Sequence, residues 1–190
     1  MNDLSPRKLY IALLHHPVKN KNGETIASAV TNLDLHDIAR IGKTYGVAAF
    51  YVVTPLEDQK TLVAKIISHW VDGWGGVHNP DRRAALALVR VKDSLAGVID
   101  EIRAKTQVPV QVVVTCATEK DRALGFDDFK DRLKAPSNAY LLVFGTASGL
   151  TDDVIAGADL VLEPIKGNTG YNHLPVRAAV AIILDRLLAG

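Results

Sequence analysis

The chain has 190 residues, of which 48% are hydrophobic and 23% charged, and its formal net charge is +1. This composition is typical of a globular protein and excludes a chain that works as a disordered or low-complexity segment. Because 22 basic residues nearly balance 21 acidic ones, a uniformly basic nucleic-acid-binding surface is excluded. Any polyanion must therefore bind at a local cluster. The length predicts a single domain, residues 1–190.

The cysteine content and the apolar runs bear on metal binding and location. Cys116 is the only cysteine, so an internal disulfide and a cysteine-rich zinc site are excluded, and we expect no bound metal. Charged residues interrupt every apolar run before it reaches membrane-spanning length. The apolar stretch Leu9–Leu14 is too short for the core of a signal peptide. We therefore expect a cytoplasmic protein that does not contact a membrane.

Apolar runs rich in β-branched residues alternate with stretches of helical periodicity. The predicted strands are 8–14, 47–53, 86–91, 108–115, 139–145 and 159–165. Their apolar character is nearly continuous, which is typical of parallel strands covered on both faces. The predicted helices lie within 35–45, 62–70, 95–102 and 176–188, the last preceded by Pro175. This order predicts an α/β fold with a mostly parallel sheet flanked by helices.

Three connections are long or unusual in composition: 17–32, 70–83 and 165–174. Long loops in compact α/β domains often carry function, and ligands in such folds bind beyond the carboxyl ends of the strands. The residues at those ends form a first expected map of a site: His15, His16, Thr54, Thr115, Cys116, Gly145, Thr146 and Ile165.

Two glycine-containing segments invite a phosphate-binding interpretation. The tripeptide GKT at 42–44 ends like a phosphate-binding loop, but Asp37 occupies the position where that loop needs a glycine. It also lies inside a helical pattern, so we reject this interpretation. The segment GTASGL at 145–150 follows a predicted strand and precedes Thr151, a candidate helix N-cap. It is either a tight turn that needs glycine dihedral angles or a loop whose backbone lies close to a ligand.

Three polar features each have two interpretations. Arg40 points away from the apolar face of its predicted helix, where the spacing favours an ion pair with Asp37 over a catalytic role. The turn-rich segment 165–174 is either a flexible connection or a loop that binds a small polar ligand through its main chain. The segment 70–83 is either an exposed or dimer-covered loop or an RNA-contacting surface. Its aromatic and polar residues are Trp74, His78, Asn79, Arg82 and Arg83.

Taken in order, three segments resemble the motifs of the SPOUT superfamily, the trefoil-knotted RNA methyltransferases that use S-adenosylmethionine. The chain is most similar to a small bacterial branch of stand-alone predicted RNA methyltransferases. In the first segment, 31–47, Arg40 precedes Gly46 by six residues, as in the family's first motif. The second, 141–165, has a strand ending in Gly145. The third, 171–187, resembles the loop and helix that close the knot.

The resemblance implies a C-terminal trefoil knot that holds S-adenosyl-L-methionine largely through main-chain groups. The positions that match the cofactor-binding motifs are Thr115, Gly145, Thr146, Ile165, Tyr171, Asn172 and Leu174. It also implies a homodimer in which Arg40 assists catalysis at the acceptor beside the partner's cofactor. Residues 146–148 differ from the second motif, which often carries a glutamate there. Pro175 and Arg177 stand where the third motif often has asparagine and serine.

The predicted activity is methyl transfer to RNA, either tRNA or rRNA, with Lys43, Arg82 and Arg83 as candidate substrate-binding residues. Whether the acceptor is a ribose oxygen or a base nitrogen stays open. A second hypothesis is a knotted cofactor-binding module that lacks its own RNA specificity and serves a partner protein. A third is an unrelated α/β enzyme that acts on a small metabolite.

Overall fold

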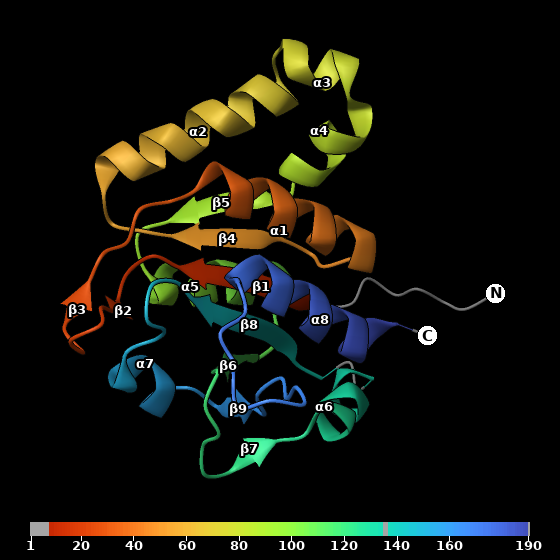
Figure 1. Cartoon of the computed structure of the whole chain (residues 1–190). Helices are drawn as coiled ribbons and strands as arrows, with labels where there is room; N and C mark the ends of the chain where they lie inside the picture. The colour runs from red at the N-terminus through yellow and green to blue at the C-terminus, as the bar shows by residue number, and fades with distance from the viewer. Residues whose placement is uncertain (1–7, 135–136, 190) are drawn as a thin grey trace.

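The computed structural model describes residues 8–134 and 137–189, which form a twisted sheet with helices on both faces (Figure 1). Seven strands form this sheet in the order β5-β4-β1-β8-β6-β9-β7, and all of their recorded pairings are parallel. The strands are β1 (Leu9–Leu14), β4 (Phe50–Val53), β5 (Val89–Lys92), β6 (Val110–Thr115), β7 (Ala123–Leu124), β8 (Ala139–Gly145) and β9 (Leu160–Leu162). A separate antiparallel hairpin joins β2 (Val18–Lys19) to β3 (Thr25–Ile26).

Eight helices accompany the strands in the described ranges. They are α1 (Asn32–Tyr45), α2 (Glu57–Val71), α3 (Trp74–His78), α4 (Pro80–Leu86), α5 (Leu95–Thr106), α6 (Phe126–Leu133), α7 (Asp152–Ala156) and α8 (Val176–Leu188). Helices α1, α6 and α8 cover one face of the sheet, and α5 covers the other. Figure 1 shows α2, α3 and α4 projecting beyond the β5 edge. No helix among the described residues is long and apolar enough to span a membrane.

Burial on both faces explains why the strands are continuously apolar. In β1, Leu9, Ile11 and Leu13 pack into the core beneath α1 and α8, and the alternate residues face α5. All six residues of β1 are buried. Because successive side chains of a strand point to opposite faces, both sets must be apolar. The predicted α/β fold with a mostly parallel sheet is therefore confirmed.

The start of one predicted strand differs from the sequence pattern for a local reason. The strand predicted from residue 47 begins at Phe50, because Gly46 ends α1 in the left-handed conformation (φ +71°). The Val47 amide then donates to Gly42 O, so the apolar residues after Gly46 complete the helix end. The GKT tripeptide lies inside α1, in agreement with the rejection of a phosphate-binding loop.

The expectation of a loop over 70–83 is wrong, because most of this segment is helical. Helix α4 begins with Pro80, and Asn79 caps it by accepting a hydrogen bond from the Arg82 amide at 2.9 Å. Asparagine followed by proline is a helix-start signal, and it was available in the sequence. The short strands β2, β3 and β7 and helix α6 were also missed. Thr151 does precede α7, but its side chain makes no capping hydrogen bond.

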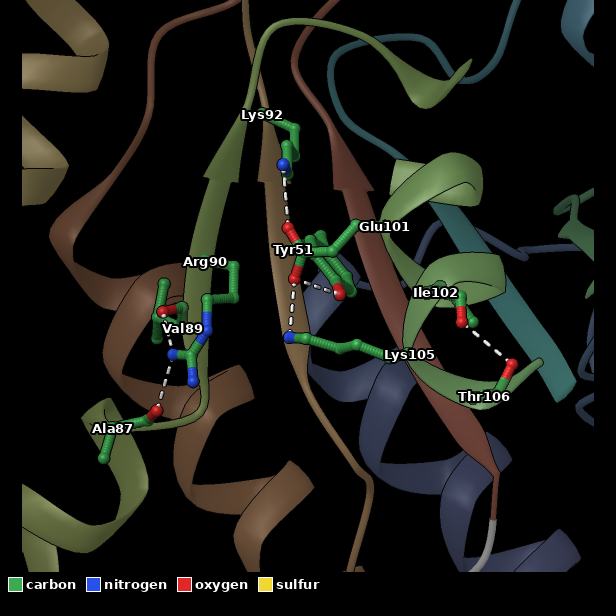
Figure 2. A network of polar contacts seen from close by, with 9 residues as sticks. All are labelled: Tyr51, Ala87, Val89, Arg90, Lys92, Glu101, Ile102, Lys105 and Thr106. Atoms are coloured by element: carbon green, nitrogen blue, oxygen red, sulfur yellow. Dashed lines mark hydrogen bonds and ion pairs between the residues drawn. The ribbon is translucent and has the colours of Figure 1, made fainter. Parts of the chain in front are cut away.

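A polar network fastens α5 to the sheet on the face opposite α1 (Figure 2). The Glu101 carboxylate accepts a hydrogen bond from Tyr51 at 3.0 Å and pairs with Lys92 and Lys105 at 2.7 Å each. Burial raises the pKa of Glu101, but the hydrogen bonds from Lys105, Lys92 and Tyr51 outweigh it and lower that pKa to about 2. The ionised carboxylate therefore stabilises the folded chain.

Glu101→Gln should destabilise the protein at pH 7 by about 1–3 kcal/mol, because the substitution removes the negative charge and replaces one acceptor oxygen with an NH2 group that cannot accept from the lysine ammonium groups. The folded-state pKa lies below the unfolded one, so this stabilisation is complete above about pH 4.5. It is lost as the pH falls toward 2. Urea unfolding of both proteins across this range measures the difference. Asp100→Asn, which removes one exposed ion pair on the same helix, is the control. A difference that does not change with pH would contradict the assignment.

Candidate functional site

A cavity of about 670 Å³ lies at the carboxyl ends of β6 and β8, the edge that Figure 1 shows beside α7. Segments distant in sequence line it: residues of the segment 19–34, the end of β6 with the residues after it, the turn after β8, α7, and the connection after β9 with the start of α8. Parallel strands bring these segments together because their carboxyl ends share one edge of the sheet. Of the predicted cofactor-binding residues, the cavity is lined by Thr115, Gly145, Thr146, Ile165, Asn172 and Leu174.

The turn after β8 is tight because two backbone segments touch at Gly145. A Cβ atom at this position would lie 2.7 Å from the Leu150 backbone nitrogen, closer than real Cβ contacts. Gly149 has a φ of +105°, and its amide donates to Thr146 O at 2.9 Å. The turn therefore needs glycine, as the first interpretation of GTASGL predicted, and its residues also line the cavity.

The β2–β3 hairpin holds this turn from the side. The Lys19 amide donates to Gly149 O, and the Ser148 amide donates to Lys19 O, each at 2.9 Å. Val18 also forms an antiparallel bridge with Leu150. The Lys19 ammonium pairs with Asp152 at the start of α7 at 2.7 Å. The long segment 17–32 therefore supports one wall of the cavity, a role that its polar composition did not reveal.

A chain of hydroxyl groups fixes the orientation of Thr146. Its Oγ1 donates to Leu14 O at 3.0 Å, and Ser28 Oγ lies 2.5 Å from Thr146 Oγ1. Ser28 Oγ in turn lies 3.1 Å from Nδ1 of the buried His15. Burial lowers the pKa of His15 to about 4, against a smaller opposing effect of the Asp34 carboxylate. His15 is therefore neutral at pH 7 and serves this arrangement as a hydrogen-bonding group.

The connection after β9 carries three of the predicted residues, Ile165, Asn172 and Leu174, to the cavity and leaves a fourth outside. Asn172 Nδ2 donates to Ala117 O at 2.5 Å, which ties this connection to the residues after β6. The Tyr171 side chain is 72% exposed, packs against the His173 ring and does not line the cavity. The structure thus brings together six of the seven predicted cofactor-binding residues.

Several charged or reactive side chains at the cavity were not predicted as ligand contacts. Lys19, Lys120 and Glu163, which lie within a few residues of strand ends used for the prediction, line it, as does Asp34 of α1. Cys116, one of the strand-end residues in the expected map of the site, also lines the cavity. Burial raises the pKa of its thiol, so Cys116 is protonated at neutral pH and unsuited to act as a nucleophile.

Arg40 lies in a different place from the cavity. It lines a second groove, of about 520 Å³, together with Arg82 and residues of α1 and α2. The proposed Arg40–Asp37 ion pair is wrong, because Asp37 pairs with Arg177 of α8 at 3.4 Å. Lys43 and Arg83 line neither of the two cavities. The predicted catalytic and substrate-binding residues are therefore divided between the groove and the exposed surface.

The architecture is that of known methylases. The chain superimposes on the TrmH/SpoU tRNA modifying enzyme of Aquifex aeolicus with a TM-score of 0.59, covering 96% of this chain and 74% of the other at 16% identity. It superimposes on the SpoU methyltransferase AviRb of Streptomyces viridochromogenes, solved with AdoMet, with a TM-score of 0.54 at 16% identity. That match covers 94% of this chain and 56% of the other. At these identities the likeness shows the fold.

Sequence comparison gives the family. Residues 8–189 match the model of the SAM-dependent RNA methyltransferases, and the chain belongs to this family. The predicted resemblance to SPOUT methyltransferases and the predicted cofactor are thereby confirmed. A "tRNA (guanine-N(1)-)-methyltransferase" of Oleidesulfovibrio alaskensis is 43% identical over 96% of this chain. An uncharacterised protein of Aquifex aeolicus is 36% identical over 95% of this chain and 88% of its own length. The chain spans only 42% of the O. alaskensis protein.

Gly145→Ala should lower the free energy of unfolding by about 1–3 kcal/mol, because the added methyl group pushes Leu150 out of the turn. The same displacement should weaken cofactor binding. Urea unfolding and calorimetric titration with S-adenosylhomocysteine measure the two effects. Gly97→Ala is the control, since its Cβ would meet Ser94 Oγ at 3.6 Å and Lys92 Cδ at 3.9 Å, both ordinary contact distances. Wild-type stability and affinity in Gly145→Ala would show that the turn tolerates a side chain.

Proposed function

We propose that this chain itself methylates RNA, with S-adenosylmethionine bound in the cavity at the carboxyl ends of β6 and β8. The observation that carries the proposal is the convergence of Thr115, Gly145, Asn172 and their neighbours on one cavity, from motifs that the family resemblance assigned to the cofactor. The proposed binding residues are Thr115, Gly145, Thr146, Ile165, Asn172 and Leu174, with Tyr171 contributing main-chain groups only.

The residues present fit such a cofactor. A cavity of about 670 Å³ is within the range that holds a drug-sized ligand. Its wall combines apolar side chains, such as Ile155 and Ile165, with the backbone of the turn after β8. Two carboxylates, Asp34 and Glu163, line it together with the ammonium groups of Lys19 and Lys120. The Phe126 amide donates to Glu163 at 2.9 Å, so this carboxylate is held in place. Apolar walls suit an adenine ring, whereas carboxylates suit hydroxyl groups and positive charge.

Methyl transfer requires that the protein orient the reactants more than that it supply a strong acid or base. The cofactor supplies a methyl group whose bond to sulfur breaks with its electron pair left on sulfur, while an acceptor oxygen or nitrogen bonds to the methyl carbon and releases a proton. The rigid turn, held by the hairpin and by the Ser28–Thr146 contact, fixes one wall against which the reactants align.

The path of the C-terminal segment supports a trefoil knot, which we include in the proposal. Strand β9 pairs with β6, whereas α8, which follows it, packs against α1 and β8. The connection between them therefore runs back across the sheet edge, where Asn172 is bonded to Ala117. A segment that passes beneath the residues after β6 on this route would close the knot.

We further propose a cytoplasmic homodimer in which Arg40 acts at the partner's acceptor site. Arg40 does not line the cavity of its own chain, so a second chain is one way to bring it to an acceptor. Exposed Leu33 of α1 and Leu174 before α8 give the neighbouring surface apolar character. Lys43, Arg82 and Arg83 remain the proposed RNA contacts.

The names of two relatives suggest an acceptor to test first. Both are called tRNA (guanine-N(1)-)-methyltransferase, but more than half of each lies outside the region that matches this chain. N1 of guanine in tRNA is therefore one candidate acceptor, and a ribose hydroxyl is the other. Mass spectrometry of nucleosides, from RNA incubated with the protein and labelled S-adenosylmethionine, distinguishes the two.

The wild-type chain should bind S-adenosylmethionine in calorimetry and transfer its methyl group to RNA from a strain that lacks the gene. Failure to bind either S-adenosylmethionine or S-adenosylhomocysteine would overturn the proposed function. Binding without transfer to any RNA, restored only when a cell extract is added, would instead favour the cofactor-binding module that serves a partner.

Arg40→Ala should reduce methyl transfer by about 100-fold or more and leave cofactor affinity within a few fold, because Arg40 lies outside the cavity. Mixing it with Gly145→Val, which blocks the cavity turn, should restore activity when subunits exchange. Each mixed dimer then has one intact Arg40 facing one intact cavity. No recovery in the exchanged mixture, or a 20.5 kDa particle in light scattering, would contradict the shared site.

A further inference from the structure

The groove that contains Arg40 is lined by the residue types that are typical of an anion-binding site. It lies between α1 and the projecting helices α2 and α4, and its volume of about 520 Å³ is enough for a nucleotide. Three cationic side chains line it: Arg40 of α1, Lys65 of α2 and Arg82 of α4. Helices α1 and α4 pack directly against each other, so these side chains are presented from a fixed framework.

None of these three cations has a carboxylate partner within 4 Å among the described residues. The one acidic residue that lines the groove, Asp37, is engaged by Arg177 of α8. Lysines elsewhere on the described surface, such as Lys60 and Lys105, do have carboxylate partners. The groove therefore keeps uncompensated positive charge in a chain whose total charge is close to zero.

Trp70 contacts two nitrogen-bearing side chains at the wall of this groove. The Arg82 guanidinium carbon lies 5.0 Å from the Trp70 ring centre, and the His36 ring meets Trp70 edge-on with centres 5.5 Å apart. His36 Nδ1 and Arg82 Nε are both buried, and neither has a hydrogen-bond partner. Buried polar atoms without partners are costly, so their presence in a cationic groove indicates a ligand with acceptor oxygens.

We propose that this groove binds a backbone phosphate of the RNA substrate through Arg82, Lys65 and His36, with Trp70 as the residue that positions Arg82 and His36. The choice of RNA rests on the proposed function, since a phosphodiester is the anion that an RNA methyltransferase meets at every nucleotide. The phosphate satisfies the two unpartnered nitrogens and neutralises the local charge. Because Arg40 lines the same groove, a nucleotide held there is next to the proposed catalytic arginine.

The first test measures binding of a fluorescein-labelled single-stranded RNA dodecamer by anisotropy at several salt concentrations. Arg82→Gln and Lys65→Gln should each weaken binding several-fold, and each should reduce the slope of log K against log salt by about 0.7, the value for one lost phosphate contact on a single strand. Arg103→Gln is the matched control, because Arg103 is an exposed residue of α5 on the opposite face of the sheet. It should bind within twofold of wild type.

The two groove variants differ in their risk of unfolding. Arg82 packs on Trp70, so its replacement can loosen α4, whereas the exposed Lys65 can be replaced without loss of packing. Wild-type RNA affinity in a folded Lys65→Gln and a folded Arg82→Gln would overturn the proposal. An equal loss in Arg103→Gln would also overturn it, because the charge effect would then not be local. Absence of RNA binding by the wild-type chain would do the same.

The second test measures the fluorescence of Trp70, which lines the groove. The chain has two tryptophans, Trp70 and Trp74, and Trp74 is 75% exposed on α3, so Trp74→Phe leaves Trp70 as the single indole fluorophore. Its emission should change when the same RNA is added, and the change should be lost in Trp74→Phe/Arg82→Gln. An unchanged emission during binding would place the RNA elsewhere and overturn the proposal.

Cofactor binding separates this inference from the proposed function. Both groove variants should bind S-adenosylhomocysteine as wild type does, because none of the groove cations lines the cavity. If the wild-type chain binds RNA through the groove but binds no cofactor, the proposed methyl transfer fails and the phosphate site stands. If it binds cofactor and methylates RNA while the groove variants keep wild-type RNA affinity, the phosphate site fails alone.

Discussion

The geometry of the cavity depends on the close approach of two backbone segments at the end of β8. Strand β8 pairs with both β1 and β6 in the middle of the sheet, so its end cannot move independently of them. At that end Gly145 lies so close to the Leu150 amide that no side chain fits between them. The turn is then clamped by the β2–β3 hairpin, and the connection after β9 is tied to the residues after β6. One rigid wall thus positions the rest of the cavity.

Most of the fold could be read from the sequence, because it follows from burial on both faces of a parallel sheet. The continuous apolar runs predicted β1, β4, β5, β6, β8 and β9, and the helical periodicity predicted α1, α2, α5 and α8. The missed elements are short or depend on tertiary contacts. Strands β2 and β3 have two residues each, and their pairing is completed by the turn after β8, over a hundred residues away. Such long-range contacts leave no periodic pattern in the sequence.

The site was predictable where it consists of strand ends and glycine turns. Thr115, Gly145, Thr146 and Ile165 meet at one cavity because parallel topology places strand ends together, whereas Asn172 and Leu174 were indicated by the family resemblance alone. The orientation of single side chains was not predictable. Spacing favoured an Arg40–Asp37 ion pair. In the structure Asp37 pairs with Arg177 instead, because tertiary packing brings α8 beside α1. Likewise, nothing local in the sequence indicates that Ser28 contacts Thr146.

Competition between cations for carboxylate partners also explains how a chain of near-neutral net charge can contain a cationic groove. A sum of charges treats every lysine and arginine alike, but a cation contributes to an external field mainly when no carboxylate lies beside it. Arg177 neutralises Asp37 and thereby leaves Arg40 without its nearest partner in sequence. Lys65 and Arg82 reach the same groove from helices that project beyond the sheet edge. A chain of charge +1 can therefore hold a strongly cationic groove, and the helix–helix contact of α8 with α1 is what keeps that groove positive.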